Sequence, residues 1–374
     1  MVRGNVLYDQ KSYKAAAAAY DVVLEEDSSN TDILWRRCKC RLEQGMDRLA
    51  IQDLDEILER SPGQYDALMA RARLKEEAGV YESALADLTE VLATRADDAN
   101  AWKYRGTIYH RMGQSDKAVQ DLSRALLLDD KQPELYYRRG LAYHQLQKPE
   151  LAKADLDNAV QIQPDSADYW YARGNVVAGL RDTDGALENY NTAIKINPEH
   201  AAAWYNHGNM LFSKGQLEEA IESWNQTIAI QPGLFRAYNN RAAAFVQLKQ
   251  YEDAVQDYEK TLELNPDFAR AYDNYAWLMA TAEDSVVRNP EKAVSYAQKA
   301  CDLTEYSHWS HLSTLAASYA EANDFESARR WLAKSWELAP ENQQPQLEQL
   351  LRLYETELEK GKVANQTSAN RVRR

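Results

Sequence analysis

Asparagine side chains recur at a fixed spacing in the second half of the chain. Asn206, Asn240 and Asn274 are equally spaced, and the same interval separates Asn175 from Asn209. An asparagine amide offers both a hydrogen-bond acceptor and donors, which are the groups that pair with a peptide main chain. A row of such amides at constant pitch can therefore hold the backbone of an extended peptide irrespective of its sequence.

Aromatic and cationic residues accompany these amides. Tyr205 directly precedes Asn206, and Arg236 and Arg270 each stand four residues before an asparagine of the row. Nearer the N-terminus, Arg138 occupies the position of the pattern that Asn206 holds later. Guanidinium and hydroxyl groups add hydrogen-bond donors for carbonyl and acidic groups. The predicted peptide-binding set is Asn175, Tyr205, Asn206, Asn209, Arg236, Asn240, Arg270, Asn274 and Arg138.

Two further columns, offset from each other by a constant interval, pair arginine with aspartate. The first holds Arg37, Arg71, Arg105, Arg139, Arg173, His207 and Arg241; the second holds Asp53, Asp87, Asp121, Asp155, Asn189, Ser223 and Asp257. A buried guanidinium is costly unless it is paired, so we predict an internal ladder of Arg–Asp pairs that fixes helix register. The alternative is that both columns are half-exposed and merely charged.

Other chemistries find no matching motif. The chain lacks GxxxxGK[ST], GxGxxG, HExxH and GxSxG, and its one close histidine pair, His308 and His311, has no third ligand nearby in sequence. Cys38, Cys40 and Cys301 form no CxxC motif and are expected to fill the core. We therefore expect no catalytic residue, no metal and no cofactor.

A 34-residue repeat positions all of these columns. An alanine recurs at Ala16, Ala50, Ala84, Ala118, Ala152, Ala186, Ala220 and Ala254, always at the same offset after a small residue at Gly4, Cys38, Ala72, Gly106, Gly140, Gly174, Gly208 or Ala242. Small residues at two fixed points indicate two helices in close contact, and a proline near the end of most units stops the second helix. We number the residues of each 34-residue repeat so that the small residue is eighth and the alanine is twentieth.

This arrangement of large aromatic, small, small and proline residues resembles the tetratricopeptide repeat family, in about ten repeats and in a form common in bacterial proteins. The resemblance implies an all-α, right-handed superhelical α-α solenoid whose first helices line a concave groove. Similar asparagine ladders hold substrate backbones in O-linked N-acetylglucosamine transferases, which suggests that role for Asn206, Asn240 and Asn274. Asparagine is also usual at these positions in repeats of no special kind.

The repeat array is expected to cover residues 1–342. Its first repeat is incomplete, because Gly4 already holds the eighth position, and unit nine is lengthened at residues 281–292. Leucines on one stripe predict a capping helix over residues 343–360. The polar, basic stretch 361–374 is expected to be disordered.

Composition narrows the partners. With 58 acidic and 44 basic side chains, the net charge of −14 argues against nucleic acid or an anionic membrane as partner of the whole surface. The N-terminus has no apolar segment of the kind found in signal peptides, so we expect a cytoplasmic protein. Basic residues in the first half are interleaved with acidic ones, which fits either an acidic peptide partner or an ordinary solvated face, and we expect the solvated face.

These observations predict a non-catalytic protein-protein interaction scaffold that binds an extended peptide or partner segment in its groove. The alternative is the substrate-recruiting or regulatory region of a larger enzyme whose catalytic part lies elsewhere, which the incomplete first repeat motivates. Self-association through the end repeats is a third possibility.

Overall fold

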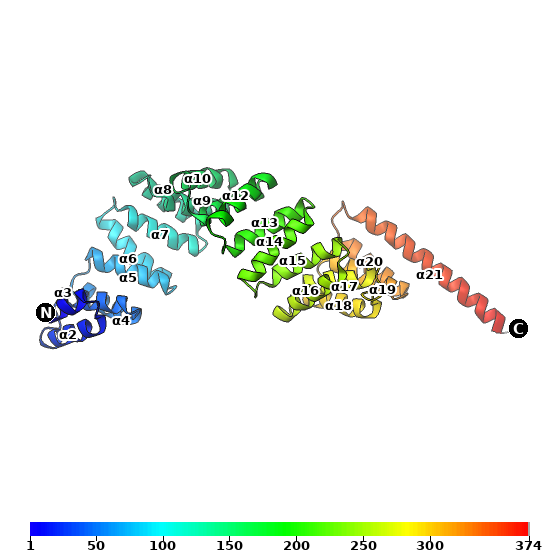
Figure 1. The fold of residues 1–374 in the computed structure, drawn as a ribbon, viewed down its shortest axis with the longest axis horizontal. Helices are drawn as coiled ribbons and strands as arrows, with labels where there is room; N and C mark the ends of the chain where they lie inside the picture. The colour runs from blue at the N-terminus through cyan, green and yellow to red at the C-terminus, as the bar shows by residue number, and fades with distance from the viewer. Residues whose placement is uncertain (373–374) are drawn as a thin grey trace. The chain divides into compact units, whose positions relative to one another are not determined.

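The computed structural model describes the backbone of residues 1–372 and the side chains of residues 1–360. Helices make up the regular structure of this part of the chain, which contains no strand (Figure 1). The first ten are α1 (Val2–Asp9), α2 (Tyr13–Glu26), α3 (Thr31–Glu43), α4 (Asp47–Arg60), α5 (Tyr65–Glu77), α6 (Tyr81–Thr94), α7 (Ala99–Arg111), α8 (Ser115–Leu128), α9 (Pro133–Gln145) and α10 (Pro149–Ile162). They are followed by α11 (Ala167–Gly179), α12 (Thr183–Ile196), α13 (Ala201–Ser213), α14 (Leu217–Ile230), α15 (Phe235–Gln247), α16 (Tyr251–Leu264), α17 (Ala269–Thr281), α18 (Pro290–Leu303), α19 (Trp309–Glu321), α20 (Phe325–Leu338) and α21 (Gln344–Val372).

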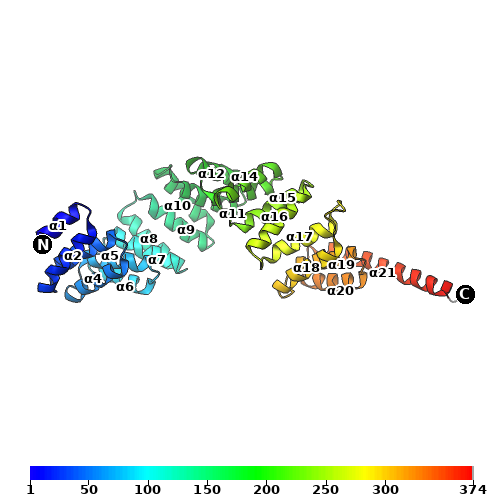
Figure 2. The same cartoon turned by 60° about the horizontal axis from the view of Figure 1, so that its bottom comes forward.

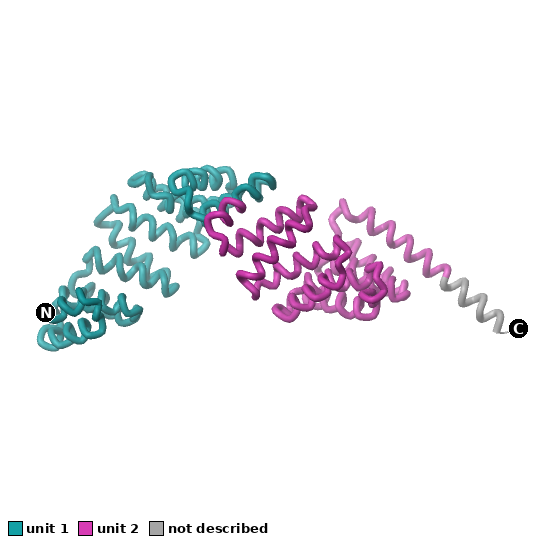
Figure 3. Tube along the Cα trace, viewed as in Figure 1, with its two compact units in different colours: residues 1–189 teal, residues 190–374 magenta. Residues whose placement is uncertain are grey.

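The chain divides into two compact units, residues 1–189 and 190–374, with the boundary inside α12 (Figure 3). In each unit the helices form hairpins, and each hairpin packs on the next (Figure 2). First helices also contact first helices: α5, α7, α9 and α11 follow one another in unit 1, and α13, α15 and α17 in unit 2. The predicted all-α solenoid of helix pairs is confirmed within each unit.

Small residues at the eighth position allow the two helices of a hairpin to approach closely. A Cβ atom added to Gly140 would lie 3.0 Å from Leu156 Cγ and 3.2 Å from the Ala152 carbonyl oxygen. At Gly106 the corresponding atom would lie 2.9 Å from Leu122 Cγ. These distances leave no room for a methyl group, so the small-residue column is a packing requirement.

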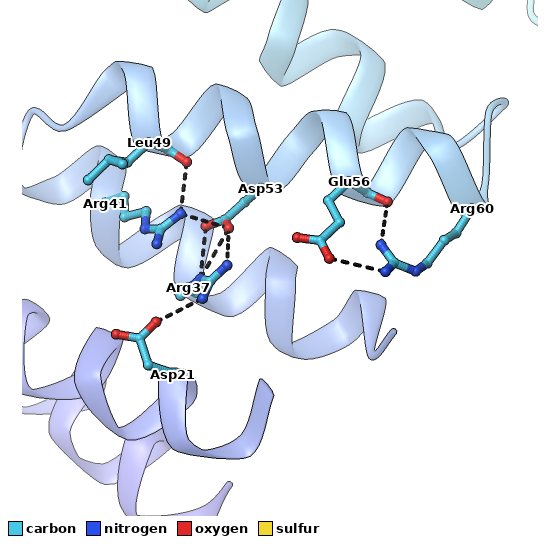
Figure 4. Close-up of polar contacts among 7 residues, drawn as sticks. All are labelled: Asp21, Arg37, Arg41, Leu49, Asp53, Glu56 and Arg60. Atoms are coloured by element: carbon cyan, nitrogen blue, oxygen red, sulfur yellow. Dashed lines mark hydrogen bonds and ion pairs between the residues drawn. The ribbon is translucent and has the colours of Figure 1, made fainter. Parts of the chain in front are cut away.

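The arginine at the seventh position connects neighbouring hairpins. Arg37 on α3 donates from Nη2 to Asp53 Oδ1 on α4 at 2.6 Å, and from Nη1 to Asp21 Oδ1 on α2 at 2.8 Å (Figure 4). Arg41 adds a second ion pair to Asp53, at 2.7 Å. One guanidinium therefore holds the second helix of its own unit and that of the preceding unit.

The same arrangement recurs along both units. Forward bonds, 16 residues onward, join Arg71 to Asp87, Arg105 to Asp121, Arg139 to Asp155, Arg173 to Asn189 and Arg241 to Asp257. Backward bonds, 16 residues earlier, join Arg71 to Asp55, Arg105 to Thr89, Arg139 to Ser123, Arg173 to Asp157 and Arg241 to Asn225. The predicted Arg–Asp ladder is confirmed. The backward bonds to the preceding repeat were not predicted from the sequence.

Because their carboxylates are buried, these pairs fix the register of the helices more than they stabilise the folded state. Asp53 and Asp257 are 0% and 5% exposed, and burial raises the pKa of both carboxyl groups despite their arginine partners. A raised pKa means that the folded state disfavours the carboxylate, so the cost of removing these groups from water is incompletely offset. In unit 2, His207 replaces arginine and lies 3.0 Å from Ser223 Oγ, and burial lowers the pKa of its imidazole.

The lengthened turn of the ninth repeat, residues 282–289, forms ion pairs with the repeats before and after it. Lys249 bonds Glu283 at 2.7 Å, and Arg288 bonds Glu321 at 3.1 Å. At the end of the array α21 packs on α20 and buries Leu347. The predicted disordered tail, residues 361–374, lies outside the residues whose side chains are described, and its disorder stays a prediction.

In each hairpin except α17–α18, the turn contains a residue in the left-handed region of backbone space. Gly113 has a φ of 73°, and one repeat later Gln147 has a φ of 55°. Glycine adopts this conformation without steric cost, whereas glutamine is strained by its Cβ. The glycines here therefore serve the turn, unlike the close-packed glycines of the eighth position.

We first predict that Arg139 and Asp155 are energetically coupled. Asp155→Ala should lower the free energy of unfolding by about 3 kcal/mol, because it leaves a half-buried guanidinium without its buried carboxylate partner. The double variant Arg139→Met, Asp155→Ala should lose clearly less stability than the sum of the losses in Asp155→Ala and Arg139→Met alone. Urea unfolding followed by circular dichroism measures all three variants, and additive losses would contradict the ladder.

We also predict opposite effects at two equivalent turn positions. Gln147→Gly should raise the free energy of unfolding by about 0.5–1 kcal/mol, because it relieves the left-handed strain by more than it loses in chain entropy. Gly113→Ala should lower it by a similar amount, although no atom lies within 4 Å of the added Cβ. Thermal unfolding of both variants checks this, and a destabilised Gln147→Gly protein would refute it.

Candidate functional site

A cavity of about 300 Å³ opens among the first helices of unit 2. Three first helices and one second helix supply its walls. Its lining residues are Tyr205, Asn209 and Phe212 on α13, Trp224 on α14, Asn239, Asn240 and Ala243 on α15, and Arg270 and Asn274 on α17. We call the polar members of this set, Tyr205, Asn209, Asn239, Asn240, Arg270 and Asn274, the amide face.

Hydrogen bonds join the asparagines of the amide face into a chain. Asn274 Nδ2 donates to Asn239 Oδ1 at 3.2 Å, and Asn239 Nδ2 donates to Asn240 Oδ1 at 3.2 Å. Asn240 Nδ2 then donates to Asn209 Oδ1 at 2.9 Å and to Tyr205 Oη at 3.1 Å. The chain crosses from α17 to α15 to α13, so it fixes the orientation of amides on three helices.

This chain decides which groups are open to a ligand. Asn240 uses both of its N–H groups within the chain, so it cannot donate to a ligand without breaking a bond. Among the described residues, Asn209 only accepts, which leaves both of its N–H groups open, and Asn274 uses one of its two. Asn239 also uses only one of its two N–H groups, but it is 1% exposed, so Asn209 and Asn274 are the more accessible amides with donors to offer.

Two further donors belong to the cavity. Trp224 is 1% exposed, and its indole Nε1 has no hydrogen-bond partner among the described residues. Arg270 is exposed and forms no ion pair with any described residue, although its charge reaches the buried Asp273. A buried N–H without a partner is unfavourable, and this indole nitrogen lies against Gly208, where an added Cβ atom would be 2.7 Å away.

Other predicted residues of unit 2 lie outside the cavity. Asn206 is on α13 but is not one of the lining residues. The Arg236 guanidinium lies over the rings of Phe235 and Phe268, with its carbon 5.4 and 5.6 Å from the ring centres. Arg236 therefore supports the start of α15, in addition to any contact with a ligand.

The two predicted residues of unit 1 occupy different surroundings. Arg138 on α9 forms an ion pair with Glu134 at 2.5 Å, one helical turn earlier. Glu134 also accepts a hydrogen bond from Tyr169 Oη at 3.0 Å. Asn175 lies on α11, also within unit 1. The amide face of unit 2 therefore includes neither Arg138 nor Asn175.

Sequence reasoning did not include two residues that shape the cavity. Asn239 is 1% exposed and links Asn240 to Asn274, while Trp224 closes the cavity from α14. The adjacent asparagines at positions 239 and 240 were the available signal for the first. For Trp224 the signal was Gly208, since a Cβ there would lie 2.7 Å from the indole nitrogen.

The remaining reactive side chains are buried or bonded to neighbouring side chains. His308 and His311 stack with ring centres 5.2 Å apart, and His311 Nδ1 lies 3.2 Å from Thr304 Oγ1. Cys38, Cys40 and Cys301 are all buried, which confirms these thiols as core residues, and burial raises the pKa of Cys38 and Cys301 to about 12. Within the described part of the chain, no three or more His, Cys, Asp or Glu side chains gather as metal ligands do.

In the same part, no helix combines the length and apolarity that crossing a bilayer requires.

Protein-family models match the chain over a continuous stretch. Models described as tetratricopeptide repeat match residues 7–72, 69–134, 107–174, 167–200, 189–222 and 235–268, and a model described as TPR repeat matches residues 208–249. Together these matches overlap from residue 7 to residue 268. No curated protein matches the chain.

Solved structures of repeat proteins are similar to parts of the chain. MamA is 26% identical over 46% of this chain and 94% of its own, with a TM-score of 0.42. YrrB, whose structure is described as a TPR protein with an unusual peptide-binding site, is 22% identical over 49% of this chain and 95% of its own, with a TM-score of 0.43.

A third solved structure, of pilF from Pseudomonas aeruginosa, is 17% identical, covers 57% of this chain and 94% of its own, and has a TM-score of 0.50. At this identity the similarity concerns the fold alone. The helical hairpins that recur with a constant period and the family models matched along residues 7–268 show that the chain belongs to the tetratricopeptide repeat family.

Proposed function

We propose that the protein is a non-catalytic interaction scaffold whose amide face binds the main chain of an extended polypeptide segment. The observation that carries this proposal is the hydrogen-bonded asparagine chain, because it orients open donors on two helices toward one cavity. Donors held in place by a satisfied network bind an acceptor with little loss of side-chain entropy. Peptide carbonyl groups are such acceptors, and they are present in every sequence.

The charge of the molecule favours a polypeptide over a nucleic acid. The net charge is −14, and a nucleic acid would bring further negative charge close to that surface. The cavity instead offers amide donors and a single guanidinium, from Arg270. A main chain with at most a few acidic side chains fits this set.

We predict that Asn209 and Asn274 carry main-chain affinity. Replacing both by alanine should weaken binding of peptides to the full chain by about 30-fold, because each main-chain hydrogen bond contributes roughly 1 kcal/mol. The measurement is titration of the full chain against an immobilised array of short peptides of varied sequence. Gln247→Ala is the matched control, since Gln247 is an exposed amide on α15 that is not among the cavity's lining residues.

Two outcomes would count against this proposal. The array could show no binding at millimolar protein, in which case the cavity does not take a peptide. Alternatively, the double variant could bind as well as the Gln247→Ala protein, in which case the open amides of the cavity do not hold the main chain.

A further inference from the structure

Helix α17 presents three chemically different side chains on one face. Arg270, Asn274 and Trp277 stand at intervals of four and three residues, which places them on a single stripe of an α-helix. Arg270 and Asn274 line the cavity of the amide face. Trp277 continues the same stripe beyond it, so a segment that enters the cavity along α17 next meets the indole.

Trp277 is unusual because it is exposed. Its side chain is 48% exposed, whereas the cavity residue Trp224 is 1% exposed. Tryptophan is a large apolar residue that contributes strongly when a partner covers it, and it is over-represented among the residues that dominate interface energies. An exposed indole beside open amide donors is therefore a surface that an apolar or aromatic side chain can cover.

Arg270 supplies a charge at the opposite end of the stripe. It is the second residue of α17, so the positive end of the helix dipole reinforces its guanidinium. No described carboxylate pairs with it, and the cavity contains no acidic side chain. Burial raises the pKa of the nearby Asp273, and the opposing effects of His311, Thr314 and Arg270 do not cancel this rise. The charge of Arg270 acts on Asp273, but Arg270 forms no ion pair with any described carboxylate, so its guanidinium can pair with an incoming one.

The length of the stripe sets the spacing of the ligand's side chains. Seven residues of α-helix separate Arg270 from Trp277, which corresponds to about 10.5 Å along the axis. A polyproline II segment has three residues per turn and rises about 3.1 Å per residue, so its residues i and i+3 point the same way, about 9.3 Å apart. In a β-strand residues i and i+3 point to opposite sides, so that conformation does not match.

We propose that the amide face selects a polyproline II segment with an acidic residue and an aromatic or large apolar residue three positions apart. The carboxylate pairs with Arg270, the apolar side chain covers Trp277, and Asn274 holds the main chain between them. This inference rests on the proposed function and adds to it the sequence and conformation of the partner. The polyproline II backbone makes no internal hydrogen bonds, so its carbonyl groups remain available to the open amides.

The test uses the full chain and short synthetic peptides with blocked ends, which removes their terminal charges. In an alanine and proline host, glutamate and phenylalanine are placed two, three or five residues apart, and fluorescence anisotropy gives the dissociation constants. We expect the spacing of three to bind at least about tenfold more tightly than the other two. At the spacing of three, a fourth peptide replaces glutamate by lysine and a fifth replaces phenylalanine by alanine.

Protein variants then separate the two ends of the stripe. Arg270→Glu should reverse the preference between the glutamate and lysine peptides, and Trp277→Ala should remove the advantage of phenylalanine over alanine. Lys299→Glu is the control for charge, because Lys299 is exposed on α18, away from the cavity's lining residues. Unchanged circular dichroism spectra establish that each variant folds, and the charge reversal itself is a gain that a misfolded protein cannot show.

The possible results distinguish this inference from the proposed function. Equal binding of all spacings, with no reversal in Arg270→Glu, would overturn the inference and leave main-chain binding by the amide face standing. Failure of every peptide to bind at millimolar concentration, together with failure on the peptide array, would remove both. Reversal by Arg270→Glu with a clear optimum at three residues supports both.

Discussion

A half-buried guanidinium that touches two hairpins is the interaction on which the rest of the structure depends. Each arginine of the seventh position bonds a residue 16 positions later and another 16 positions earlier. The first contact closes its own hairpin, and the second attaches the hairpin to the preceding one. Since a guanidinium is planar with donors at fixed angles, it specifies the relative placement of three helices more closely than apolar packing alone would.

The amide face depends on this placement. Asn240 is adjacent to Arg241, whose bonds to Asp257 and Asn225 hold α15 against α16 and α14. The asparagine chain needs α13, α15 and α17 at the correct distances, because amide hydrogen bonds weaken steeply when the geometry is wrong. Where position seven becomes Tyr275, its hydroxyl still reaches back 16 residues to Glu259, at 3.2 Å. The backward contact thus continues onto α17, although the forward carboxylate pairing does not.

Much of the fold could be predicted from the sequence, because its determinants recur at the same positions. The forward pairs were visible since aspartate repeats in one column. The backward partners include Asp21, Thr89, Ser123 and Asn225, which share only the ability to accept a hydrogen bond, so no single residue type marked them. The candidate site was harder to predict. Its asparagines were found by their spacing, but which amides keep open donors depends on bonds through Asn239, and a spacing argument does not contain those bonds.

Native-state hydrogen exchange of an Arg139→Met variant tests the two-sided role of the arginine most directly. The account predicts faster exchange of amides in α8, which carries the backward partner Ser123, as well as in α10, which carries the forward partner Asp155. The protection of amides in α3 and α4 against exchange should be unchanged, because Arg37 joins these two helices. Faster exchange confined to α9 and α10 would contradict the account, because it would mean that the guanidinium closes its own hairpin and does not connect it to the one before.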